Sequence, residues 1–113
     1  MRRIFLKVAP AIIFIGLAML TFPSHLRAQS NAIKVYKTNC ALCHSADGSG
    51  DSSSGKALKA KDLRSPEVQG KSDAELAEVI TKGKGKMPAF GHKLSADVIK
   101  SLLAYIRELP KMK

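Results

Sequence analysis

The chain has 113 residues and a formal net charge of +10, with two cysteines, two tyrosines, four phenylalanines and no tryptophan. Two cysteines are too few for the disulfide scaffolds that hold together many small exported proteins. So few aromatic residues also argue against a nucleic acid as the partner of this basic chain, whereas an acidic protein would suit it.

The N-terminal residues have the pattern of an export signal. Three basic residues among the first seven precede an apolar stretch over 8–22, and Ala28 offers a small residue for cleavage. We therefore predict a signal peptide over 1–28, one mature domain over 29–113 and a periplasmic or otherwise extracytoplasmic location. The general secretory route is favoured over the twin-arginine route that Arg2-Arg3 suggests. An uncleaved segment that anchors the chain in a membrane is the alternative.

The first predicted helix of the mature domain, 31–43, leads into the sequence Cys40-Ala41-Leu42-Cys43-His44. This C-x-x-C-H spacing is the one that attaches a c-type haem. Each thiol can form a thioether with one vinyl group, and helical spacing puts both cysteines on the same side of one turn. His44 then brings its imidazole to the iron as an axial ligand.

Other uses of these residues stay open at this point. A Cys40–Cys43 disulfide would leave His44 without a purpose. A zinc site needs four ligands, so His92 would have to join the three residues of the motif. A thioredoxin-like use needs strands that alternate with helices, and the sequence shows none. A haem would also supply apolar mass to a small domain whose own core looks thin.

The segment after the motif is predicted to be a loop over 45–55, because it is nearly all Ser, Gly and Asp. A short helical piece over 56–61 follows, with Leu58 and Leu63 as inward anchors. Ser30 or Asn31 can cap the helix over 31–43. Neither helical segment has the alternating pattern of a β-strand.

Two further helices have clear start signals. Ser72 and Glu75 form a capping box, and the helix they begin is predicted to end near Lys82-Gly83. Ser95 can cap a last helix with a wide apolar stripe, which Pro110 is predicted to stop. The fold class predicted from these elements is all-α.

Met87 is the predicted second axial ligand of the iron. Its thioether pairs with histidine in a known haem ligation, and Pro88 favours a loop that presents a side chain. His92 and Met112 are the alternatives for this position.

The chain resembles the small monohaem class I c-type cytochromes, in segments that cover most of 29–113. This resemblance implies a cytochrome c fold with three to five helices around one covalently attached haem c, with iron held by His44 and Met87 and with Tyr36 near Tyr105. It implies a one-electron carrier that cycles the iron between Fe(III) and Fe(II), and no enzyme activity. The matching segments are 36–44, 47–50, 56–63, 87–90 and 94–109.

Two positions depart from the pattern of the family. Ser45 stands where members often have Gly after the haem-binding histidine. Some members also have a proline whose carbonyl receives the imidazole N–H, but no proline lies between His44 and Pro66. The acceptor that orients His44 is therefore unassigned.

The charges around Met87 suggest the kind of partner. Lys82, Lys84, Lys86 and Lys93 would steer an acidic redox protein toward a haem edge beside them. We expect a monomer with redox proteins as partners. The alternatives are a haem enzyme or gas sensor with an open sixth position, or an electron-transfer subunit of a larger oxidoreductase complex.

Overall fold

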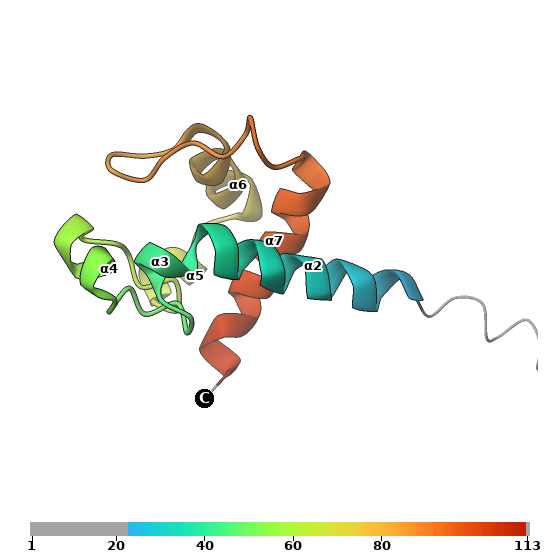
Figure 1. Cartoon of the computed structure of the whole chain (residues 1–113), viewed down its shortest axis with the longest axis horizontal. Helices are drawn as coiled ribbons and strands as arrows, with labels where there is room; N and C mark the ends of the chain where they lie inside the picture. The colour runs from blue at the N-terminus through green and yellow to red at the C-terminus, as the bar shows by residue number, and fades with distance from the viewer. Residues whose placement is uncertain (1–22, 113) are drawn as a thin grey trace, which may run out of the picture.

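The computed structural model describes residues 23–112, which form helices joined by loops (Figure 1). Most of the predicted signal, 1–28, therefore lies outside the described residues. Within 23–112, no helix is both long and apolar enough to cross a membrane. The prediction of an all-α fold is confirmed. In chain order the elements are α2 (Pro23–Asn39), α3 (Ala41–His44), α4 (Ser53–Leu58), α5 (Pro66–Gln69), α6 (Asp73–Lys82), α7 (Ala96–Glu108) and the 3-10 helix η1 (Leu109–Lys111).

The crossing of α2 over α7 is the central contact of the fold (Figure 1). Tyr36 of α2 is completely buried there, and its ring meets that of Tyr105 edge-on, with the centroids 5.1 Å apart. The Tyr36 hydroxyl donates to the carbonyl oxygen of Ser45 at 2.7 Å. The predicted contact between the first and last helices is therefore confirmed, and it also fixes the backbone next to His44.

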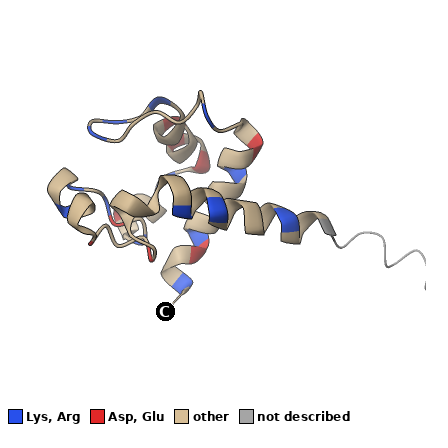
Figure 2. Ribbon diagram, in the orientation of Figure 1, with Lys and Arg blue, Asp and Glu red and all other residues tan. Residues whose placement is uncertain are grey.

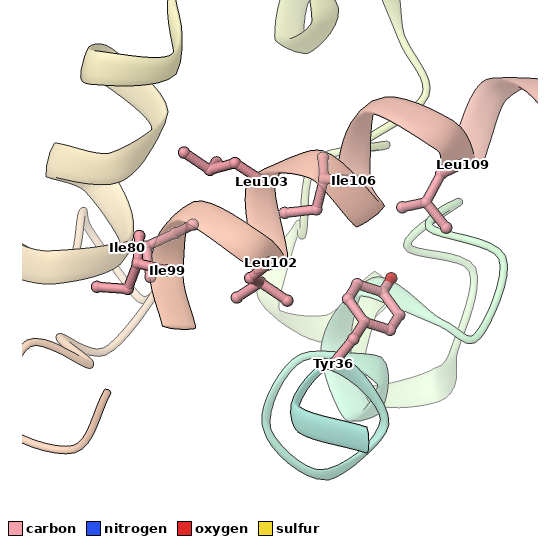
Figure 3. Packing of buried hydrophobic residues seen from close by; sticks show 7 residues of the cluster. All are labelled: Tyr36, Ile80, Ile99, Leu102, Leu103, Ile106 and Leu109. Atoms are coloured by element: carbon pink, nitrogen blue, oxygen red, sulfur yellow. The ribbon is translucent and has the colours of Figure 1, made fainter. Parts of the chain in front are cut away.

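The core is built along one face of α7 (Figure 3). Ser95 begins this helix by accepting a hydrogen bond from the N–H of Val98, as its sequence predicts. Apolar residues then recur at helical spacing, and Tyr36 of α2 and Ile80 of α6 pack against them. The α7–η1 residues of this stripe are Ile99, Leu102, Leu103, Ile106 and Leu109.

The helix α6 follows its sequence signals at both ends. The Ser72 hydroxyl accepts from the N–H of Glu75, whose carboxylate accepts from the N–H of Ser72, so the capping box is confirmed. The helix ends before Gly83, which has a φ of 77°. A glycine tolerates this left-handed value, and the chain can therefore turn sharply toward Met87.

Three local predictions are wrong. The first helix begins at Pro23, not near Asn31, because the residues after Pro23 are compatible with a helix and proline fits a first helical position. The helix after the motif is α4, three residues earlier than predicted, since Ser52 caps it. Leu58 is 41% exposed and is not part of the core, whereas Leu63 packs against the core as predicted. The sequence analysis also missed α5, whose start is marked by a Ser65-Pro66 cap.

Arg107 ties α7 to the segment between α5 and α6. Its guanidinium donates to the carbonyl oxygens of Gln69 at 2.8 Å and Lys71 at 2.6 Å, and to the Asp73 carboxylate at 2.8 Å. Asp73 is exposed, so that ion pair contributes little. The two part-buried carbonyl groups make the larger contribution, because both would lose a partner if the guanidinium were removed.

We therefore expect Arg107→Met to destabilise the folded protein by about 1–3 kcal/mol, since methionine keeps the apolar stem but leaves these carbonyls unpaired. Urea unfolding of the purified protein measures the change. Lys111→Met is the control, because Lys111 bonds the exposed Glu108 in the same helical region. Equal midpoints for the two variants would show that the Arg107 contacts add no stability.

Candidate haem-binding site

A cavity of about 190 Å³ opens between α3, α5, α6, α7 and the loop after α6. Its walls are mostly apolar, and they include two members of the C-x-x-C-H motif as well as Met87. The residues that line it are Cys40, His44, Lys61, Leu63, Glu67, Val68, Lys71, Leu76, Val79, Ile80, Lys84, Met87, Phe90, Leu94, Leu102, Leu103 and Ile106.

The C-x-x-C-H motif forms a single helical turn after a break in the chain. The helix α2 ends before Cys40, and the carbonyl oxygen of Cys40 accepts from the N–H groups of Cys43 at 3.2 Å and His44 at 2.9 Å. Ser45, with a φ of 65°, ends the turn. Both thiols are free. Cys40 and His44 line the cavity, and Cys43 lies on the same turn between them.

The His44 imidazole has the hydrogen-bond partner that the sequence left unassigned. Its Nδ1 lies 2.9 Å from the carbonyl oxygen of Lys61. A carbonyl oxygen can only accept, so Nδ1 carries the proton and the lone pair is on Nε2. The ring is thereby held in the tautomer that a metal ligand needs, with Nε2 free to bind.

The segment that carries the Lys61 carbonyl is itself held in place by α4 and by the loop between α3 and α4. On one side of Lys61, the N–H of Ala60 donates to Gly55 at 2.8 Å; on the other, the N–H of Leu63 donates to Gly48 at 2.8 Å. Gly48 has a φ of 82°. Two backbone bonds therefore fix the short segment that orients His44.

Met87 reaches the cavity from a tight turn. Lys84 and Met87 exchange two backbone hydrogen bonds of 3.0 Å, and Gly85 between them has a φ of 57°. Beyond Pro88, the N–H of Phe90 donates to Ile80 of α6 at 2.9 Å. These contacts hold the Met87 side chain in the cavity wall. The alternatives lie elsewhere: His92 is in an exposed turn and Met112 is 51% exposed.

The sulfur atom of Cys40 lies in a setting that suits a neutral group. Burial, together with the neighbouring Cys43, raises the pKa of the Cys40 thiol to about 11. The charged thiolate is thus disfavoured there, whereas a thioether carries no charge. Neutral sulfur, an imidazole with a free Nε2 and apolar walls are a donor set that fits a covalently attached haem.

A zinc site has no comparable support. In residues 23–112, no three or more His, Cys, Asp or Glu side chains gather where they could hold a metal ion. His92, which the zinc alternative needs, lies outside the cavity lining that contains Cys40 and His44.

The lysines predicted to dock a partner lie on and near the loop that follows α6, where Figure 2 shows several basic segments. Lys84 and Lys86 are exposed on this loop. Lys82 bonds Glu78 at 2.8 Å, which offsets its charge. Lys93 donates to the Asn39 side chain at 3.1 Å, next to Cys40.

The chain is similar to several c-type cytochromes. The family model described as cytochrome c oxidase, cbb3-type, subunit III, matches residues 27–106. A cytochrome c6 of Leptolyngbya boryana is 42% identical over 65% of this chain and 82% of its own length. A cytochrome c6 of Gloeothece citriformis is 32% identical over 96% of this chain and 94% of its own length. The solved structure of the KustC0563 c-type cytochrome covers 69% of this chain and 95% of its own, with 30% identity and a TM-score of 0.64.

Proposed function

The chain belongs to the monohaem class I c-type cytochromes, and we propose that it carries single electrons between protein partners outside the cytoplasm. Family membership gives it one covalently attached haem c with iron, and it makes the chain a cytochrome c6-like electron carrier and not an enzyme. The compartment, the iron ligands and the docking face are parts of the proposal.

The observation that carries the proposal is that one apolar cavity is lined by Cys40, His44 and Met87. We assign the thioether bonds to Cys40 and Cys43, and the two axial positions to His44 and Met87. The haem supplies the one-electron Fe(III)/Fe(II) couple. In this assignment Met87 would fill the position that an enzyme or a gas sensor keeps open, and the mostly apolar walls would lower the polarity around the redox centre.

A place in a larger oxidoreductase complex is the second candidate. It is favoured by the match to the subunit III family of cbb3-type cytochrome c oxidase. The near-full-length similarity to a cytochrome c6 favours a free carrier instead, and we propose that the mature protein, 29–113, is a monomer exported by the signal over 1–28. If that segment is not cleaved, it would anchor the same domain to the membrane.

The test is spectroscopy and redox titration of the exported holoprotein. We expect a low-spin haem in both oxidation states, reversible one-electron titration, and a haem that stays with the chain after denaturation because it is covalently bound. The N-terminal sequence of the mature protein tests the cleavage site. A high-spin ferric haem that readily binds peroxide would favour the alternative of a haem enzyme with an open sixth position, and it would contradict the proposal.

The proposed docking face makes a separate prediction for Lys86 and Lys93, which lie outside the cavity lining. Replacing both with glutamine is expected to slow oxidation by an anionic reagent, hexacyanoferrate(III), several-fold at low salt. The reason is that positive charge beside the haem edge attracts an anion, and salt screens this attraction over about 10 Å at 0.1 M. Stopped-flow rates at several ionic strengths measure the effect.

Lys34 and Lys100, exposed on α2 and α7, give the control pair, because their replacement removes the same charge elsewhere. Oxidation by a cationic cobalt(III) complex should instead become faster in the Lys86 and Lys93 variant. If both double variants slow hexacyanoferrate equally, only net charge matters and the docking face is contradicted.

A further inference from the structure

We propose that Lys61, Lys71 and Lys84 form a cationic rim that binds the two haem propionates, with Glu67 as an anion within the rim that lowers the reduction potential. This inference rests on the proposed function. It assigns a role to Lys61, Lys71 and Glu67, which that function did not use, and a second role to Lys84.

The charged side chains of the cavity lining are the three lysines and Glu67, in walls that are otherwise mostly apolar. Lys61 Nζ lies 3.0 and 3.3 Å from the two carboxylate oxygens of Glu67. The hydrogen bond and charge of Lys61 lower the pKa of Glu67, and Lys71 and Lys84 add smaller effects in the same direction. Lys61 therefore pairs directly with Glu67, and Lys71 and Lys84 line the same cavity.

The cationic rim is joined by backbone contacts to both proposed axial ligands. The Lys61 carbonyl oxygen accepts from His44 Nδ1, and Lys84 exchanges two backbone hydrogen bonds with Met87. Lys61 is therefore tied to the histidine side of the cavity, and Lys84 to the methionine side. An anion bound between these two lysines would lie between the two proposed iron ligands.

The net charge of the four charged lining residues is equal and opposite to that of the two haem propionates. Three lysines less one glutamate leave a formal surplus of two positive charges at the cavity. Haem carries two propionate carboxylates, and a carboxylate at an apolar cavity needs charged or hydrogen-bonding partners. Flexible lysine side chains can supply these, and Lys61 can turn from Glu67 to a propionate without moving its backbone carbonyl.

The sign of the effect of Glu67 follows from electrostatics. Reduction of Fe(III) to Fe(II) removes one positive charge, so a nearby anion favours the oxidised state and a nearby cation favours the reduced state. Glu67→Gln is therefore expected to raise the midpoint potential, and Lys61→Gln to lower it. Neither variant alters the Lys61 carbonyl that orients His44.

The matched control is the ion pair of Lys82 with Glu78. It has a similar length, 2.8 Å against 3.0 Å, and similar exposure, but neither member lines the cavity. The experiment compares Glu67→Gln with Glu78→Gln, and Lys61→Gln with Lys82→Gln, by mediated spectroelectrochemistry of the holoprotein at low salt. Proton NMR of the oxidised protein follows the propionate methylene signals in the same variants.

We expect each rim variant to change the equilibrium constant for reduction by about threefold, in opposite directions, and each control variant to change it much less. The propionate signals should move in Lys61→Gln and stay in place in Lys82→Gln. A haem-loaded protein in which rim and control variants behave alike overturns this inference alone. A wild-type protein without attached haem overturns the proposed function and the inference together.

Discussion

Replacing Met87 with alanine is expected to remove the weak far-red sulfur-to-iron charge-transfer band and to lower the reduction potential of the protein. A thioether ligand opposite histidine raises the potential of a haem, because it is a soft and neutral donor. Alanine leaves that position to water or to another side chain. Absorption spectra of the ferric protein follow the band, and a redox titration measures the potential. These are the largest changes in haem properties that we predict.

Two other replacements separate the candidate ligands. Met112→Ala removes the other methionine of the described residues, and His92→Ala removes the exposed histidine that could form a bis-histidine site. Both variants should keep the charge-transfer band and the potential of the wild type. A band that survives Met87→Ala, or that disappears in Met112→Ala, would contradict the assignment of Met87.

The parts of the fold and of the site that the sequence predicts are those whose residues lie close together along the chain. The capping box of Ser72 and Glu75 and the cap at Ser95 each involve side chains three residues from their partners, so their pattern can be recognised in the sequence. The C-x-x-C-H motif is local in the same sense, because one helical turn contains all of it. Met87 lies 43 residues beyond His44, and it is predicted from the Met-Pro pair together with the known pairing of a thioether with histidine. The structure brings it into the same cavity lining as His44.

The parts that the sequence did not predict depend on backbone groups that are distant along the chain. The acceptor for His44 is the carbonyl oxygen of Lys61, 17 residues away, and every residue type has such a carbonyl. The start of α4 depends on Ser52, whose hydroxyl both caps the helix and donates to the Leu42 carbonyl at 2.7 Å. A serine-rich segment contains several possible caps, and only packing against α3 selects this one.

Gly55 is the residue where that packing is tightest. It lies in α4 and is buried, and a Cβ atom at this position would overlap the backbone carbonyl oxygens of Cys43 and Gly50. Ser52 begins the helix, but the absence of a side chain at Gly55 is what allows α4 to lie directly against the turn that contains the C-x-x-C-H motif. Its carbonyl oxygen also accepts from Ala60, next to the Lys61 group that orients His44.

We therefore expect Gly55→Ala to destabilise the protein by about 2 kcal/mol or more and to reduce the yield of haem-loaded protein, as overpacking against rigid backbone does. Helix propensity alone predicts the opposite, a gain of about 1 kcal/mol, because alanine is the better helix former. Urea unfolding and the haem content of exported protein decide between the two. Ser53→Ala, at an exposed position of the same helix, is the control. A stabilised, fully haem-loaded Gly55→Ala protein would show that α4 can move away from Cys43 without disturbing the site.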